Sequence, residues 1–96
     1  MTRSEAVGAL QGLEPELRKL GVRSISLFGS VLRNEAKPQS DLDLIVEFDP
    51  PHTAQQYFDT LFLIEDSLGV SVDLAEPGTL HPSIRDRILT EAQRVA

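Results

Sequence analysis

Asp41, Asp43 and Asp73 are the residues of this chain whose type and spacing best suit metal chemistry. Asp41 and Asp43 are two positions apart in a stretch of alternating polar and apolar residues, and such residues project from one face of a strand about 6.5 Å apart. Asp73 occupies a polar position of another alternating stretch. Carboxylate oxygens are ligands that Mg²⁺ prefers. If the two stretches pair as neighbouring strands, we expect the three carboxylates to converge on a metal site.

A glycine and a serine, at positions 29 and 30, precede Asp41 by ten intervening residues. Glycine lets backbone N–H groups approach a phosphate closely, and a serine at the start of a helix adds a hydroxyl beside amides that favour anions. We therefore predict that Gly29 and Ser30 form a cradle for a triphosphate. Ser30 could also cap a helix, a role that needs no nucleotide and is compatible with phosphate binding.

Three aspartates around two Mg²⁺ ions about 3.5–4 Å apart support one kind of reaction. Such a site activates an attacking hydroxyl, neutralises a triphosphate and stabilises the leaving pyrophosphate in an in-line displacement. The predicted activity is the transfer of a nucleotidyl group from a nucleoside triphosphate. An Asp-x-Asp pair by itself is more often a solvated strand edge or turn, but its combination with Gly29, Ser30 and Asp73 favours the metal site.

The elements that position these residues are predicted from hydrophobic spacing. Helices are expected at residues 4–20, 30–33 and 53–68 and around Ile84, Ile88, Leu89 and Val95. Strands are expected at residues 22–28, 41–48 and 70–74. This pattern predicts an α+β (α/β) fold with a small mixed sheet of about three strands flanked by helices.

Two local features refine that prediction. Pro15 cannot donate a backbone hydrogen bond, so the first helix is either kinked there or restarted with Pro15 in its first turn. Alternation in residues 41–48 places Asp41, Asp43, Ile45 and Glu47 on a polar face opposite the core.

Composition narrows the class of protein. The 96 residues predict a single domain, residues 1–96, and the absence of cysteine suits a reducing cytoplasm. No apolar stretch approaches the roughly 20 residues that span a bilayer, so no membrane association or export is expected. A net charge of −6 makes direct nucleic-acid binding unlikely. His52 and His81 lack further ligands at metal spacing and are predicted to be structural or exposed.

Residues 27–33 (Leu-Phe-Gly-Ser-Val-Leu-Arg) and 40–46 (Ser-Asp-Leu-Asp-Leu-Ile-Val) resemble the signature of the DNA polymerase β-like nucleotidyltransferase superfamily. The resemblance is closest to its minimal branch, known as MNT, and extends over nearly the whole chain. It implies that two ions are held by the catalytic aspartates Asp41, Asp43 and Asp73, and that Gly29 and Ser30 bind phosphate. Arg33 matches an arginine usual in this branch and is expected to contact the nucleotide or a partner. The glycine that commonly follows it is Asn34 here, which can still adopt a left-handed conformation.

Members of this branch are typically antitoxins encoded beside HEPN-domain ribonuclease toxins, and some transfer AMP from ATP to a tyrosine of the toxin. The resemblance implies ATP as substrate and a hydroxyl of a HEPN-type toxin as acceptor. Two alternatives stay open: a binding module that neutralises its partner by complex formation alone, and transfer to a small molecule or RNA. The sequence leaves open the acceptor, the preferred nucleotide, the number of nucleotides added, the oligomeric state and whether the site is still active.

Overall fold

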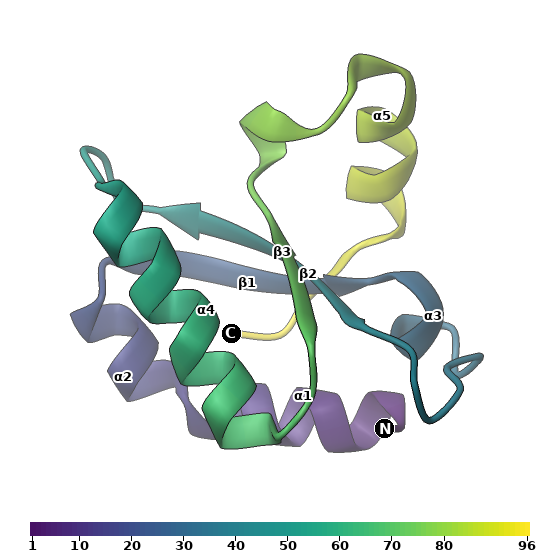
Figure 1. Cartoon of the computed structure of the whole chain (residues 1–96). Coiled ribbons are helices and arrows are strands. Elements are labelled where there is room, and N and C mark those ends of the chain that lie inside the picture. Colours follow the sequence, from purple (N-terminus) through teal and green to yellow (C-terminus); the bar gives the residue numbers. More distant parts are fainter.

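The computed structural model describes all 96 residues as a four-stranded mixed sheet with helices packed against it (Figure 1). The strands are β1 (Val22–Phe28), β2 (Leu42–Phe48), β3 (Val72–Ala75) and β4 (Gln93–Arg94), in the spatial order β3-β2-β1-β4. The helices are α1 (Arg3–Gly12), α2 (Glu14–Lys19), α3 (Gly29–Leu32), α4 (Ala54–Leu68), the 3₁₀ helix η1 (Pro77–Thr79) and α5 (Pro82–Glu91). The predicted fold class is confirmed. None of the helices combines the length and the apolar character needed to cross a bilayer.

The main core lies between one face of the sheet and the helices α1, α2 and α4. Leu10 of α1, Leu17 of α2 and Ile64 of α4 are fully buried and belong to one cluster of sixteen buried residues. Leu44 and Val46 enter the same cluster from β2, as its alternation predicts. Burying a side chain of this size contributes about 1.5–3 kcal/mol. This packing fixes the strands that carry the aspartates.

The first helical segment is restarted at Pro15 rather than kinked. Helix α1 ends at Gly12, and α2 begins at Glu14 with Pro15 in its first turn, where the missing N–H costs nothing. At the other end of α1, Thr2 and Glu5 form a reciprocal capping box. The chain therefore enters the sheet from two short helices that both contribute to the core.

The sheet combines both kinds of strand pairing. Strands β1 and β2 are antiparallel, whereas β2 and β3 are parallel and are connected through α4. Parallel neighbours need such a crossover connection. Helix α4 packs against β3, which lies at the edge of the sheet directly beside β2.

Two sequence expectations need correction. The prediction that Val95 belongs to the last helix is wrong: α5 ends at Glu91, and Val95 lies buried just after the short strand β4. Ile45 lies on the face of β2 opposite the main core, as expected, but it is buried rather than exposed. Ile88 of α5 is also buried outside the main cluster, so this second face is partly apolar.

Candidate functional site

Asp43 and Asp73 lie side by side on neighbouring parallel strands. Asp43 is the second residue of β2 and Asp73 the second of β3, and the register pairs them directly. Neighbouring strands are about 4.8 Å apart. Both positions alternate with core residues such as Leu44, so the two carboxylates share the face opposite the main core. The two strands do pair, which is the condition on which convergence of the carboxylates depends. Asp41 lies one residue before β2 and is exposed.

The carboxyl group of Asp43 is in an unfavourable environment for a negative charge. Burial raises its pKa most, the charges of Asp73 and Asp41 raise it further, and Arg33 lowers it. Like charges close together disfavour the ionised form. A cation beside these side chains would relieve that repulsion.

The carboxylates nevertheless do not converge as fully as the sequence suggested. No group of three histidine, cysteine, aspartate or glutamate side chains is placed so that it could hold a metal ion. Asp41 lies at the exposed entry to β2, ahead of the register pair formed by Asp43 and Asp73. The carboxylates of Asp43 and Asp73 are still suitable ligands for Mg²⁺. This ion commonly binds only one or two carboxylates and completes its coordination shell with water and substrate phosphate.

Gly29 forms the turn that leads from β1 into α3, immediately beside Asp43. Its φ of +76° lies in the left-handed region, which side chains rarely adopt. A Cβ atom at this position would clash with the carboxylate oxygen Oδ2 of Asp43 and would lie 2.9 Å from its Cγ. Phe28, the residue before the turn, pairs with Asp43 across the antiparallel strands. Only glycine therefore brings this turn against the aspartate, and Ser30 follows as the second residue of α3.

Arg33 links α3 to α5 through ion pairs. Its Nη1 lies 2.6 Å from Oε1 of Glu91, and its Nε lies 3.1 Å from Oε2 of Glu35. The next residue, Asn34, has a φ of 56°, which confirms the expected left-handed conformation. Arg33 therefore lies near Gly29, but its guanidinium is already paired with the carboxylates of Glu35 and Glu91.

A pocket of about 420 Å³ opens beside the Gly29 turn, between α3 and α5. It is lined by Phe28, Gly29, Arg33, Arg87, Ile88 and Glu91. Two arginines therefore border a recess next to the predicted phosphate turn. The sequence analysis missed Arg87 and Glu91 because the spacing of α5 indicated only a packing helix, and nothing local shows that its C-terminal half meets α3.

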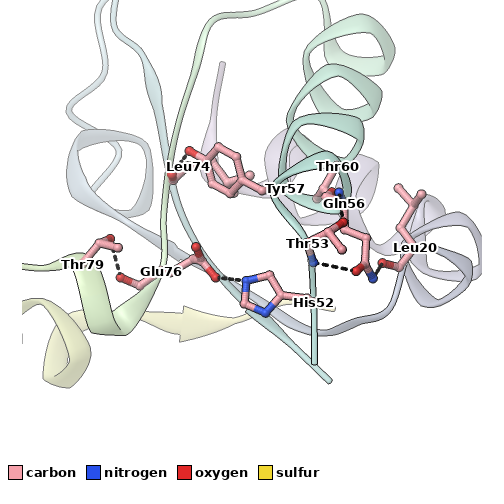
Figure 2. Close-up of polar contacts among 9 residues, drawn as sticks. All are labelled: Leu20, His52, Thr53, Gln56, Tyr57, Thr60, Leu74, Glu76 and Thr79. Carbon is pink, nitrogen blue, oxygen red and sulfur yellow. Dashed lines mark hydrogen bonds and ion pairs between the residues drawn. The ribbon is translucent and has the colours of Figure 1, made fainter. Parts of the chain in front are cut away.

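A second pocket, of about 350 Å³, lies at the far end of β3, against the start of α4 (Figure 2). Here Nε2 of His52 lies 2.7 Å from the carboxylate oxygen Oε1 of Glu76, and the His52 ring stacks on Phe48 with ring centroids 4.6 Å apart. On the opposite wall the hydroxyl of Tyr57 donates to the carbonyl oxygen of Leu74 at 2.5 Å. His81 caps α5 by accepting from the N–H of its second residue. Both histidines thus have structural partners within the fold.

Comparisons with known proteins agree with this fold. A family model described as a nucleotidyltransferase domain matches residues 10–95. The protein adenylyltransferase MntA of Thermococcus cleftensis is 35% identical over 92 residues, which cover 95% of this chain and 93% of that protein. A solved structure described as a minimal nucleotidyltransferase is 31% identical, with a TM-score of 0.85 over 97% of this chain and 95% of that one. A chain from a toxin–antitoxin crystal structure with AMP-PNP shares the fold at 18% identity, with a TM-score of 0.71 over 90% of this chain and 72% of that one.

The chain therefore belongs to the nucleotidyltransferase domain family and, within it, to the minimal nucleotidyltransferases. It is a nucleotidyltransferase.

Proposed function

We propose that the chain transfers AMP from ATP to a hydroxyl group of a partner protein in a Mg²⁺-dependent reaction. The observation that carries this proposal is the direct pairing of Asp43 with Asp73, beside which the chain turns at Gly29. Only glycine fits this turn, because a Cβ atom at position 29 would collide with the carboxylate of Asp43. This pairing brings the Gly29 turn at the end of β1 and the carboxylates of Asp43 and Asp73 together from three strands. The protein adenylyltransferase name of the Thermococcus cleftensis relative supports the choice of a protein as acceptor.

Each site residue has a separate task in this proposal. Asp41, Asp43 and Asp73 hold Mg²⁺, and Asp41 has to turn inward to join the other two. Bound Mg²⁺ supplies Lewis-acid charge that neutralises the triphosphate and the leaving pyrophosphate. The backbone of Gly29 and the hydroxyl of Ser30 bind phosphate oxygens.

The pocket between α3 and α5 receives the rest of the nucleotide. Arg33 and Arg87 border this pocket and provide positive charge for phosphate oxygens. Glu91 holds Arg33 in place while the pocket is empty, because their side chains form an ion pair at 2.6 Å. Nucleotide phosphates compete with Glu91 and Glu35 for the same guanidinium.

The reaction is a displacement at the α-phosphorus of ATP. The oxygen of the acceptor hydroxyl forms a bond to the α-phosphorus, and the bond from that phosphorus to the oxygen bridging to the β-phosphate breaks. Pyrophosphate leaves with that oxygen. The proton of the acceptor hydroxyl passes to the carboxylate of Asp73 and then to solvent. In-line attack and charge neutralisation are the main demands of phosphoryl-type transfer, and the paired aspartates address both.

The proposed acceptor is a tyrosine of a HEPN-type toxin, with this chain acting as its antitoxin in the cytoplasm. The toxin–antitoxin structure that contains AMP-PNP has the same fold and supports this biological setting. A modified tyrosine would carry a bulky anion, which could block the function of the toxin.

The alternative is a non-catalytic antitoxin that neutralises its partner by forming a complex. The ion pairs of Arg33 favour it, because a guanidinium already held by two carboxylates is less available to a nucleotide. In that case neutralisation needs a lasting complex and survives replacement of Asp41 and Asp43.

Radiolabelled ATP separates these functions and also identifies the group transferred. Label on the α-phosphate should appear on the partner protein, whereas label on the γ-phosphate should leave with pyrophosphate. Label transferred only from the γ-phosphate would show a kinase reaction instead. No transfer of either label to a partner that binds stably would support the non-catalytic antitoxin.

A further inference from the structure

Two phenylalanines on the outer face of α4 are left about half exposed. Phe58 is 47% exposed and Phe62, one helical turn later, is 54% exposed. Their rings stack with centroids 6.3 Å apart, and Phe58 also meets the ring of Tyr57 edge-on at 5.3 Å. On the opposite face of the helix, Thr60 and Ile64 are fully buried. The two phenylalanines thus form an ordered apolar surface that the core does not use.

This apolar surface lies in a segment with charge of one sign. Between Lys37 and Arg85 the chain contains no lysine or arginine. The same segment carries nine acidic residues: Asp41, Asp43, Glu47, Asp49, Asp59, Glu65, Asp66, Asp73 and Glu76. It comprises β2, α4 and β3, whereas the nine basic residues all lie outside it. Asp59 and Asp66 are exposed and flank Phe62 on the helix at spacings of three and four residues.

We propose that the Phe58–Phe62 face of α4 docks a partner protein whose contact surface combines an apolar recess with lysine and arginine side chains. The inference rests on the proposed function, because the partner is the protein that receives the nucleotidyl group. Large aromatic side chains supply most of the binding energy in many interfaces, and complementary charge around them sets partner choice and association rate. A second copy of this chain fits poorly, since a symmetric contact would bring the acidic rims of both copies together.

The docking face is held at a fixed position relative to the candidate site. The hydroxyl of Tyr57 donates to the carbonyl oxygen of Leu74 at 2.5 Å, and the N–H of Val72 donates to Oε2 of Glu65 at 3.0 Å. These two bonds tie α4 to β3, the edge strand that carries Asp73 between Val72 and Leu74. Figure 2 shows the first of the two bonds. A partner bound to α4 therefore lies beside β3 on the core side of the sheet, and it has to extend around this edge strand to reach the face that carries Asp73.

Replacement of both phenylalanines tests the docking face. The binding partner in the experiment is the protein encoded by the neighbouring gene, titrated calorimetrically with Phe58→Gln/Phe62→Gln. We expect the dissociation constant to rise about 30-fold or more, the usual effect of truncating buried aromatic anchors. Leu89→Gln is the matched control, because Leu89 is 41% exposed on α5; its affinity should stay within about twofold of the unchanged chain. Circular dichroism melting shows whether the double variant is folded.

Charge reversal provides a second test that leaves the aromatic rings in place. Asp59→Lys/Asp66→Lys should weaken binding and flatten its dependence on salt, because the attraction to a basic rim is lost. Sedimentation velocity of the chain alone tests whether a second copy of the chain occupies this face instead. A dimer that Phe58→Gln/Phe62→Gln dissociates would show that a second copy covers this face and would overturn the proposal.

The outcomes for docking and for catalysis can be told apart. If AMP is transferred to the partner and Phe58→Gln/Phe62→Gln binds as tightly as the unchanged chain, the docking face is wrong and the proposed function stands. If the folded phenylalanine variant loses binding while the unchanged chain binds without transferring AMP, the docking face stands and the adenylyltransferase activity fails. Unaltered binding by both the phenylalanine and the charge variants would reject the docking face whatever the activity.

Discussion

Asp43 of β2 and Asp73 of β3 are direct partners in the parallel register, with their carboxylates on the same face of the sheet. The pairing places two negative charges at neighbouring positions, and it is one cause of the raised pKa of Asp43, after burial. A fold selected for stability alone gains nothing from such a pair. A site that binds a cation and a triphosphate gains from both carboxylates.

Asp43→Asn should separate activity from stability. We expect nucleotidyl transfer to be lost, while the free energy of unfolding stays unchanged or rises by about 0.5 kcal/mol because a like-charge pair across neighbouring strands is removed. Urea denaturation measures the stability, and label transfer measures the activity. Glu47→Gln is the control, because Glu47 is exposed on the same face of β2 four residues after Asp43; this variant should keep its activity. Marked destabilisation by Asp43→Asn would mean that Asp43 has a structural role.

Gly29→Ala should damage both the fold and the site. The left-handed φ costs about 1–2 kcal/mol with a side chain present, and the new methyl group would collide with the Asp43 carboxylate. We therefore expect a lower melting temperature and loss of transfer. Gly8→Ala is the matched control: nothing lies within 4 Å of a Cβ there, so replacement within α1 should stabilise the protein by about 1 kcal/mol. Full activity in a folded Gly29→Ala variant would contradict the assigned turn.

Arg33→Ala and Arg87→Ala should each weaken the use of ATP. Both arginines border the pocket beside Gly29, and loss of one charge-assisted contact to phosphate should raise KM for ATP about tenfold. Steady-state kinetics with ATP as the varied substrate measure the effect. Arg23→Ala, whose side chain is paired with Asp49 instead, is the control and should leave KM unchanged. If KM for ATP is the same in all three variants, the nucleotide binds elsewhere.

Mg²⁺ should stabilise the protein through the paired aspartates. A ligand that binds only the folded state raises the melting temperature, and the increase grows with its concentration above the dissociation constant. We expect Mg²⁺ with ATP to raise the melting temperature of the unchanged chain and EDTA to reverse the increase. Asp43→Asn and Asp73→Asn should show a much smaller increase. An equal increase in all three proteins would place the metal away from these residues.

The sequence predicts the positions of Asp43 and Asp73 because they depend on local periodicity. Alternation in β2 and β3 sets which side chains face away from the core. The pairing of these strands is only a condition for convergence of the carboxylates, and the parallel register meets it by placing the two aspartates directly opposite each other. Their roles in metal binding and catalysis stay predictions until they are measured.

Other features depend on packing that no local pattern contains. The ion pair between Arg33 and Glu91 joins residues 58 positions apart, and it exists only because α5 returns to α3. Strand β4 has two polar residues, too few for any periodicity, and is defined by its pairing with Ser26 and Leu27. Pro15 allowed either a kink or a restart, and the structure shows a restart in which Leu17 of α2 packs into the core.

The intact mass of the partner protein tests the central claim most directly. The purified chain is incubated with Mg²⁺, ATP and the product of the neighbouring gene, and both chains are weighed by mass spectrometry beside an Asp41→Ala/Asp43→Ala control. We expect the partner to gain whole AMP units with the unchanged chain and to keep its mass with the control. A partner that gains no mass with any of the four nucleoside triphosphates, or gains as much with the control, would contradict this claim.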